Sequence, residues 1–363
     1  MPKKDPNSIG FAVVGYGVIG AHHCRAINEA VGAELVAICD IDAEAARAGG
    51  EKWGVPWYTS LSELLANPDV DVVNVCVPTG LHAEVGIAAA RAGKHVVCEK
   101  PLDVNLEKAD ALIRACRENG VKLAAIFQRR LHPLSRRIKE AVDSGRLGRI
   151  VYADIHLYWY RTPEYYAGGR PPGWRGTWKY DGGGACMNQG IHSVDFIQWI
   201  VGPVRSVFAK TGTFTHNIEA EDVGTATIQF VNGALGNITC TTSAYPGLTN
   251  DFHLFGERGS IVVQDNDKVI TWRIQQGDVA KEKAEEAQMR EWYSGSRESP
   301  AADPVALGSA GKDGHTMHIE DMVQAIRENR DPVIPGEQAR HAIEIILAMY
   351  ESARTGREIT LPL

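Results

Sequence analysis

The stretch that most restricts the fold of this chain is VVGYGVIG, residues 13–20. An apolar run, IGFAVV, leads into it, and a segment with helical spacing, VIGAHHCRAINEA, leads out of it. Gly15, Gly17 and Gly20 therefore occupy the spacing GxGxxG at a strand-to-helix turn. In such a turn the first glycine permits a tight bend, the second lets the backbone approach a pyrophosphate, and the third lets helix and strand pack closely. The stretch predicts a dinucleotide site on a parallel sheet.

The first third of the chain continues this alternation of short apolar runs and helical segments. The runs ELVAIC, VVNVCV, HVVCE and KLAAIF are apolar on both faces, as buried parallel strands are. Residues 1–130 are therefore predicted to form a Rossmann domain, a doubly wound parallel sheet with right-handed crossovers that binds NAD or NADP.

Longer β-rich segments follow and predict a second domain over residues 131–363. RIVYADIHLYWY, VGTATIQFV and GSIVVQ belong to this series, and VNGA and GERGS suit the hairpin turns between segments. The predicted fold is an α/β domain with a large open, mostly antiparallel sheet, whose last helix can pack back on the Rossmann domain. The charged stretch 278–304 is interpreted as a helical excursion or a loop.

Composition excludes several classes of protein. A net charge of −7 argues against a nucleic-acid or anionic-membrane surface. No window approaches the roughly 20 apolar residues of a membrane helix, and no leader pattern precedes the first strand. The seven cysteines are odd in number and form no CxxC, so we expect reduced core residues and a cytoplasmic protein.

Asp40 falls at the end of the second predicted strand, twenty residues after Gly20. A carboxylate there can accept hydrogen bonds from the adenosine ribose and would repel a 2′-phosphate, so NAD is favoured over NADP. Asp42 competes for this role. The carboxyl ends of the strands face the ligand crevice, so further residues are predicted to bind the cofactor. They are Tyr16, Val18, Ile19, Val77, Pro78, Thr79, His82, Glu99, Lys100 and Pro101. His82 alternatively caps its own helix or packs locally.

A second stretch, DGGGACMNQGIHSVD, begins at Asp181. Spacings of four and three place Asn188, His192 and Asp195 on one face of an otherwise apolar helix. We expect this polar face to line a crevice and the glycines to let the start of the helix approach a ligand. The alternative makes His192 a core histidine with satisfied hydrogen bonds.

Three motifs, GxGxxG, EKP at Glu99–Pro101 and GGG followed by NxxxHxxD, together resemble those of the Gfo/Idh/MocA oxidoreductases over nearly the whole chain. The resemblance implies nicotinamide-dependent oxidation or reduction of a sugar or cyclitol carbon. It implies that Lys100 hydrogen-bonds the reacting oxygen, that His192 is the general acid/base, and that Gln128 contacts the cofactor. Independently, alcohol oxidation needs a base that titrates near neutral pH and a cation that favours the alkoxide, which histidine and lysine supply.

Asn188 stands where many members of this family have aspartate. An amide can hydrogen-bond a substrate hydroxyl, but it cannot accept a proton. The asparagine variant resembles members that act on nucleotide-linked amino-sugar acids. Asp195 is expected either to orient His192 or to form a structural cap or salt bridge.

Aromatic and basic residues around YWYRTPEYY and GWRGTWKY suit stacking on a sugar ring, and equally suit a core or a subunit interface. Trp174, Arg175 and Trp178 are predicted to line the substrate pocket, and His315 is predicted to contact the substrate. His315 and His318 have the i, i+3 spacing of one helix face, but no third ligand is evident nearby, so no metal is predicted.

The sequence thus predicts an NAD-dependent oxidoreductase that transfers hydride between the nicotinamide and a ring carbon of a sugar, cyclitol or nucleotide-linked sugar acid. Two alternatives stay open: an NAD-dependent glycosidase that oxidises its sugar transiently, and a non-enzymatic dinucleotide sensor, against which Lys100 and His192 argue. An uncovered apolar sheet face is a liability, so we expect a homo-oligomer, a dimer or tetramer, through the C-terminal sheet.

Overall fold

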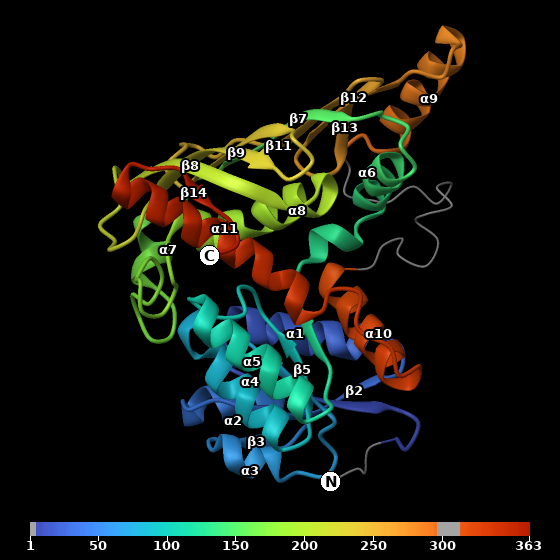
Figure 1. Ribbon diagram of the computed structural model, residues 1–363. Helices are drawn as coiled ribbons and strands as arrows, with labels where there is room; N and C mark the ends of the chain where they lie inside the picture. The colour runs from blue at the N-terminus through green and yellow to red at the C-terminus, as the bar shows by residue number, and fades with distance from the viewer. Residues whose placement is uncertain (1–4, 296–312) are drawn as a thin grey trace. The chain divides into compact units, whose positions relative to one another are not determined.

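The computed structural model describes residues 5–295 and 313–363 (Figure 1). The chain forms two compact units and crosses between them several times. Among the described residues, unit 1 comprises 5–128, 167–182 and 313–341, and unit 2 comprises 129–166, 183–295 and 342–363. The first crossing lies close to the predicted boundary at 130, but two later segments that were predicted for the second domain belong to unit 1.

Unit 1 contains a six-stranded sheet with the order β3-β2-β1-β4-β5-β6. Every pairing in it is parallel. The strands are β1 (Ile9–Val14), β2 (Ala33–Cys39), β3 (Trp57–Tyr58), β4 (Val72–Val75), β5 (His95–Cys98) and β6 (Leu123–Ala125). The helices are α1 (Val18–Glu29), α2 (Ala43–Trp53), α3 (Leu61–Leu65), α4 (His82–Arg91), α5 (Leu106–Glu118) and α10 (Gly314–Arg327), with a short 3₁₀ turn, η1 (Thr79–Leu81). The order and the parallel pairing confirm the predicted Rossmann sheet.

The core of unit 1 explains why a late segment of the chain belongs to it. Phe11 and Val13 of β1 and Ile27 of α1 lie in one buried cluster with Met322 and Val323 of α10. Because the apolar side chains of α10 are buried there, this helix completes the covering of the Rossmann sheet.

Unit 2 contains an eight-stranded sheet with the order β13-β12-β11-β7-β10-β9-β8-β14. All pairings are antiparallel except that of β7 with β10. The strands are β7 (Ile150–Tyr158), β8 (Val204–Gly212), β9 (Val223–Phe230), β10 (Leu235–Thr241), β11 (Asn250–Gly256), β12 (Gly259–Gln264), β13 (Lys268–Ile274) and β14 (Ile359–Thr360). The mostly antiparallel sheet was predicted correctly.

Helices cover this second sheet from one side. α8 (Ile191–Val201) packs on β7, and the π-helical turn η3 (Ala185–Gly190) that leads into α8 packs on β9 and β10. Figure 1 shows α8 and the C-terminal half of α11 (Gly336–Thr355) on the same face of the sheet. The remaining helices are α6 (Pro133–Asp143), α7 (Pro163–Ala167) and α9 (Val279–Trp292), with a second 3₁₀ turn, η2 (Gln128–Leu131).

α9 accounts for most of the charged stretch that was predicted as a helical excursion or a loop, and residues 296–304 of that stretch lie outside the described residues. In the ranges 5–295 and 313–363, no helix has both the length and the apolar character needed to cross a membrane.

Candidate functional site

The glycine-rich turn between β1 and α1 has the geometry that its spacing predicts. Gly15 has φ +93°, and a Cβ on it would lie 2.7 Å from the backbone carbonyl of Cys76. A Cβ on Gly20 would lie 1.9 Å from the carbonyl oxygen of Gly15. Apart from its chain neighbours and the adjoining helix backbone, no atom of the described chain lies within 4 Å of a Cβ placed on Gly17, so space remains at that position. Gly17 is also the N-cap of α1 and provides no side-chain cap, so the helix N-terminus suits a phosphate.

Asp40 contacts this turn directly. Its carboxylate accepts hydrogen bonds from the backbone N–H of Tyr16 (2.7 Å) and of Asp42 (2.9 Å). Asp42, the competing residue, is the N-cap of α2 and accepts from the N–H groups of Glu44 and Ala45. The carboxylate that lies on the glycine-rich turn is therefore that of Asp40.

His82 joins the loops that follow β4 and β5. Its Nδ1 lies 2.7 Å from the carbonyl oxygen of Pro101, and its Nε2 lies 2.9 Å from that of Val77. Burial lowers the pKa of His82. At the start of α4, the backbone N–H of Ala83 donates a hydrogen bond to the carboxylate of Asp103, so Asp103 and not His82 caps this N–H. The His82 ring thus connects the two loops that are predicted to bind the cofactor. A contact of His82 with the cofactor itself stays a prediction.

The other predicted cofactor residues line the same edge of the sheet with differing exposure. Val18 is 88% exposed, Pro101 and Thr79 are buried, and Tyr16, Ile19, Val77 and Pro78 are half-buried. Gln128 carries a buried side-chain oxygen, Oε1, that has no hydrogen-bond partner among the described residues. Such an atom is costly to bury unless a ligand or water satisfies it, so it fits a cofactor contact.

Glu99 is the centre of a buried polar cluster that sequence reasoning did not foresee. Its Oε1 accepts from His23 Nε2 (2.9 Å) and lies 3.2 Å from His315 Nε2, and its Oε2 accepts from the N–H of Lys100 (3.1 Å). Burial alone raises the pKa of Glu99, but the hydrogen bonds from the two histidines outweigh it and hold the pKa well below its usual range. A fixed negative charge therefore lies at the backbone of Lys100, whose side chain is half-buried.

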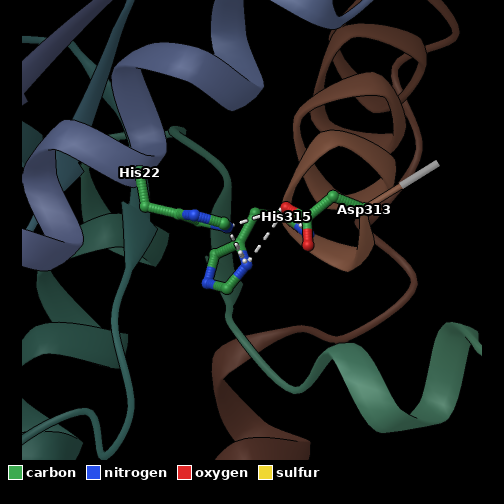
Figure 2. A group of neighbouring side chains, drawn as sticks. All are labelled: His22, Asp313 and His315. Atoms are coloured by element: carbon green, nitrogen blue, oxygen red, sulfur yellow. Dashed lines mark hydrogen bonds and ion pairs between the residues drawn. The ribbon is translucent and has the colours of Figure 1, made fainter. Parts of the chain in front are cut away.

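His315 lies in this cluster together with His22 and Asp313 (Figure 2). Burial lowers the pKa of His315, but the carboxylates of Asp313 and Glu99 outweigh it and raise the pKa to about 9. Both ring nitrogens of His315 already have neighbours within unit 1, so its predicted substrate contact stays a prediction. His318 points elsewhere: its Nε2 accepts from the N–H of Phe127, and burial lowers its pKa to about 3.

The aromatic residues before the glycines belong to unit 1. Trp174 and Arg175 are half-buried, with the guanidinium carbon 5.0 Å from the Trp174 ring centre, and Trp178 is 47% exposed. The segment is anchored where the N–H of Gly80 in η1 donates to the carbonyl of Tyr180 (2.9 Å). These exposures exclude a place in the core of unit 1, and stacking on a sugar stays a prediction.

In unit 2, the start of the helical segment that carries His192 is capped by a buried carboxylate. Glu221 accepts from the N–H groups of Gly184 (3.0 Å) and Cys186 (2.8 Å) and from the hydroxyl of Tyr350 (2.9 Å). A Cβ on Gly184 would lie 1.8 Å from the carbonyl oxygen of Glu221. At Gly184 the missing side chain thus makes room for Glu221, and the approach of a ligand to the three glycines stays a prediction.

Asn188 lies at the end of a side-chain network in unit 2. Its Oδ1 accepts from the hydroxyl of Tyr165 (3.3 Å) and from Nε2 of Gln189. Gln189 also accepts from Arg161 (2.6 Å), whose guanidinium lies over the Tyr165 ring at 4.9 Å. Sequence reasoning missed Arg161 and Gln189, although both stand inside the quoted motifs. The network places a cation close to Asn188, which suits a polar or anionic substrate.

His192 follows about one turn later and is half-buried, whereas Asp195 is 1% exposed. The guanidinium of Arg130 binds Asp195 through two hydrogen bonds, with its Nε 2.7 Å from Oδ2. Of the roles left open for Asp195, the structure shows the salt bridge. Asp195 is therefore buried in an ion pair, whereas Asn188 and His192 are half-buried.

This buried pair gives a stability prediction. Asp195→Asn is expected to lower the free energy of unfolding by about 3–5 kcal/mol, because it leaves the Arg130 charge buried without its counter-charge. Guanidinium unfolding followed by tryptophan fluorescence measures this loss. Glu257→Gln is the control, since its pair with Arg149 is exposed and contributes about 0–1 kcal/mol. Equal effects of the two substitutions would contradict the assigned role of the pair.

Two family models match the chain. The model described as the oxidoreductase family with an NAD-binding Rossmann fold matches residues 9–127, and the GFO/IDH/MocA C-terminal domain matches residues 135–262.

Individual relatives cover nearly the whole chain. The crystal structure of the WlbA dehydrogenase from Bordetella pertussis in complex with NADH and UDP-GlcNAcA is 34% identical, with a TM-score of 0.87 and 99% of each chain covered. Myo-inositol 2-dehydrogenase from Thermotoga maritima is 29% identical over 96% of this chain and 97% of its own length. The uncharacterized oxidoreductase YrbE from Bacillus subtilis is 28% identical over 96% of this chain and 95% of its own.

Proposed function

Because this chain belongs to the Gfo/Idh/MocA family of NAD-binding oxidoreductases, we propose that it oxidises a ring hydroxyl of a nucleotide-linked sugar acid. The observation that carries the substrate class is the 34% identity, over 99% of both chains, to a dehydrogenase whose structure contains NADH and UDP-GlcNAcA. Asn188 supports it, because the asparagine variant resembles members that act on nucleotide-linked amino-sugar acids, and an amide can hydrogen-bond a substrate hydroxyl.

The proposed chemistry needs two residues of this chain. His192 accepts the proton of the reacting hydroxyl, and Lys100 hydrogen-bonds the same oxygen and favours its alkoxide form. Bound NAD supplies the acceptor for the hydride that leaves the ring carbon. Asn188 holds a neighbouring hydroxyl through its amide, with its Oδ1 oriented by Tyr165 and Gln189. Lys100 and His192 come from different units, so a variant that lacks both side chains tests their joint action.

The residues present fit the cofactor. Gly17 leaves space beside the uncapped start of α1 for a pyrophosphate, and Asp40 lies on the same turn, where it can accept from the ribose hydroxyls. The buried Oε1 of Gln128 can accept a further hydrogen bond from the cofactor.

Asp40→Ser is expected to narrow the preference for NAD over NADP by about tenfold or more, because a 2′-phosphate no longer meets a carboxylate. Fluorescence titration of both reduced cofactors measures the two dissociation constants. Asp42→Ser is the matched control. Because Asp42 is the N-cap of α2, this substitution is expected to leave the cofactor preference unchanged. Tighter binding of NADPH than of NADH by the unmodified protein would contradict the role of Asp40.

The substrate class is tested with three compounds and NAD: UDP-GlcNAcA, UDP-GlcNAc, which lacks only the carboxylate of the sugar, and myo-inositol. We expect kcat/KM for the sugar acid to exceed that for the other two by about a hundredfold or more, because a site built around a polar group rejects an analogue that lacks it. NADH absorbance measures the rates. Equal rates with UDP-GlcNAc and UDP-GlcNAcA would mean that the enzyme does not recognise the carboxylate of the sugar. A preference for myo-inositol would overturn the proposed substrate class.

We propose that the chain forms a homo-oligomer through the open face of the unit 2 sheet. Phe208 of β8 and Leu235 of β10, which the strand register places on one face of this sheet, are 44% and 51% exposed. Light scattering of the purified protein measures its mass, and a monomer would contradict this proposal.

A cytoplasmic location is also proposed, in line with seven cysteines that are all buried and free.

A further inference from the structure

Three side chains of unit 1 converge at one point (Figure 2). His22 belongs to α1, and Asp313 and His315 stand at the start of α10. The Nε2 atom of His22 lies 2.8 Å from Oδ2 of Asp313 and 3.1 Å from Nδ1 of His315, and the last two atoms lie 3.5 Å apart. Two imidazole nitrogens and one carboxylate oxygen thus form a compact triangle.

The size of this triangle suits a metal ion. Zinc binds such atoms at about 2.0–2.2 Å, so the ligand atoms of a tetrahedral site lie about 3.3 Å from one another. The three separations lie on both sides of this value. We propose that His22, Asp313 and His315 bind one divalent transition-metal ion, with zinc as the favoured ion.

The surroundings of His315 are those of a metal ligand. Metal-bound histidines usually donate their second ring N–H to a carboxylate, which fixes the ring and the tautomer. The Nε2 of His315 lies 3.2 Å from Glu99, and Glu99 is itself held by His23, which pairs with Asn74. Nδ1 of His315 is therefore left facing the other two ligands. The charges of Asp313 and Glu99, on opposite sides of the ring, favour a positive ion.

Access and coordination number fit a site with one open position. The side chain of His315 is 10% exposed, that of His22 26% and that of Asp313 37%. An ion can enter from the side of His22 and Asp313, and water can complete the tetrahedron. The neighbouring group of His23, Glu99 and His315 does not suit an ion, because both imidazoles point an Nε2 atom at the same oxygen of Glu99.

Arg25 opposes metal binding in a way that makes the proposal testable. Its guanidinium donates to Nδ1 of His22 at 2.8 Å, which places the ring proton on Nε2, the atom that must bind the ion. The Arg25 side chain is 55% exposed and lies 3.9 Å from Glu29, so it can turn to that carboxylate. Removing this guanidinium should therefore strengthen metal binding.

The ion would join the two helices that pack together in unit 1. α1 follows the glycine-rich turn, and α10 contributes to the same core. Since the ligands are 291 or more residues apart across this contact, a bound ion stabilises the folded unit in proportion to its occupancy. The proposed role is structural and independent of the substrate proposed above.

The test uses the full-length protein, stripped with a chelator and titrated with Co²⁺, whose visible bands report a tetrahedral site. We expect one equivalent to bind. His22→Ala should weaken Co²⁺ binding by about a hundredfold, because losing a ligand costs at least as much affinity as losing a group that hydrogen-bonds a ligand. Arg25→Ala should bind Co²⁺ more tightly than the unmodified protein. His156→Ala, on β7 of unit 2, is the matched control and should not change binding.

Thermal unfolding with and without zinc gives a second readout, and NADH binding checks that each variant is folded. Zinc should raise the melting temperature of the unmodified protein and of Arg25→Ala, but not that of His22→Ala. Absence of tetrahedral Co²⁺ bands would overturn the proposal. Equal binding by His22→Ala, or weaker binding by Arg25→Ala, would do the same and would assign the triangle to hydrogen bonds.

Discussion

His192→Ala is expected to lower kcat by about a hundredfold or more while the affinity for NAD stays nearly unchanged. The imidazole is half-buried on α8, and His192 is not among the residues that are predicted to bind the dinucleotide, so the variant removes the base and leaves those residues in place. Steady-state kinetics on the substrate found in the panel, together with NADH titration, separate the two effects. His253→Ala, on β11, is the control for loss of a histidine from unit 2.

Lys100→Ala is expected to cause a loss of the same order. If both groups act on one oxygen, the double variant should lose far less than the product of the two single losses, because residues that act as a unit are not additive. Normal turnover of His192→Ala would mean that His192 is a structural residue of unit 2 and not the general base. Fully multiplicative losses would mean that the two residues serve different steps.

Asn188→Asp is expected to move the pH–rate profile for oxidation to higher pH. The carboxylate introduced about one turn before His192 favours the protonated ring, and the base must be neutral to accept the substrate proton. The fold should persist, since a carboxylate oxygen accepts the bonds from Tyr165 and Gln189 as readily as the amide oxygen does.

The profile is measured for both forms on one substrate. Asn237→Asp is the control, because Asn237 lies on β10 of the sheet, where its amide donates to Tyr152. An unmoved profile for Asn188→Asp would place Asn188 outside the catalytic pocket.

Local sequence patterns were sufficient to predict the Rossmann sheet and the protein family. The turn around Gly15, Gly17 and Gly20 has a physical requirement at each position that adjacent residues reveal. The strands β1, β2, β4, β5 and β6 follow from apolar runs of the right length, whereas β3 has only two residues and no apolar run predicted it. The starts of α2 and α5 follow from their N-caps. These signals are short-range, so a single sequence contains them.

Long-range partners could not be predicted in the same way. Asp195 pairs with Arg130, 65 residues earlier, and helical spacing alone gave it the same face as His192. Glu221 caps the start of η3 from a separate strand connection, so no local motif announces it. The π-helical geometry of η3 also shifts side chains by a fraction of a turn relative to an α-helix, which a period of 3.6 residues does not describe.

The candidate metal triangle shows the same limit. His315 and His318 have the spacing of one helix face, yet they point to different neighbours. The partner of His315 is His22, 293 residues away, and only the packing of α10 on α1 brings the two rings together. The proposed ligands lie too far apart in the sequence for their spacing to suggest a shared site.

The most direct test of the central claim follows a labelled hydrogen atom. UDP-GlcNAcA deuterated at its ring carbons is incubated with NAD and the enzyme, and the reduced cofactor and the sugar are analysed by mass spectrometry. We expect net formation of NADH that carries one deuterium, together with a ketone on the intact nucleotide-linked sugar. Cleavage of the glycosidic bond without net reduction of NAD, or reduced cofactor that contains no deuterium, would contradict it.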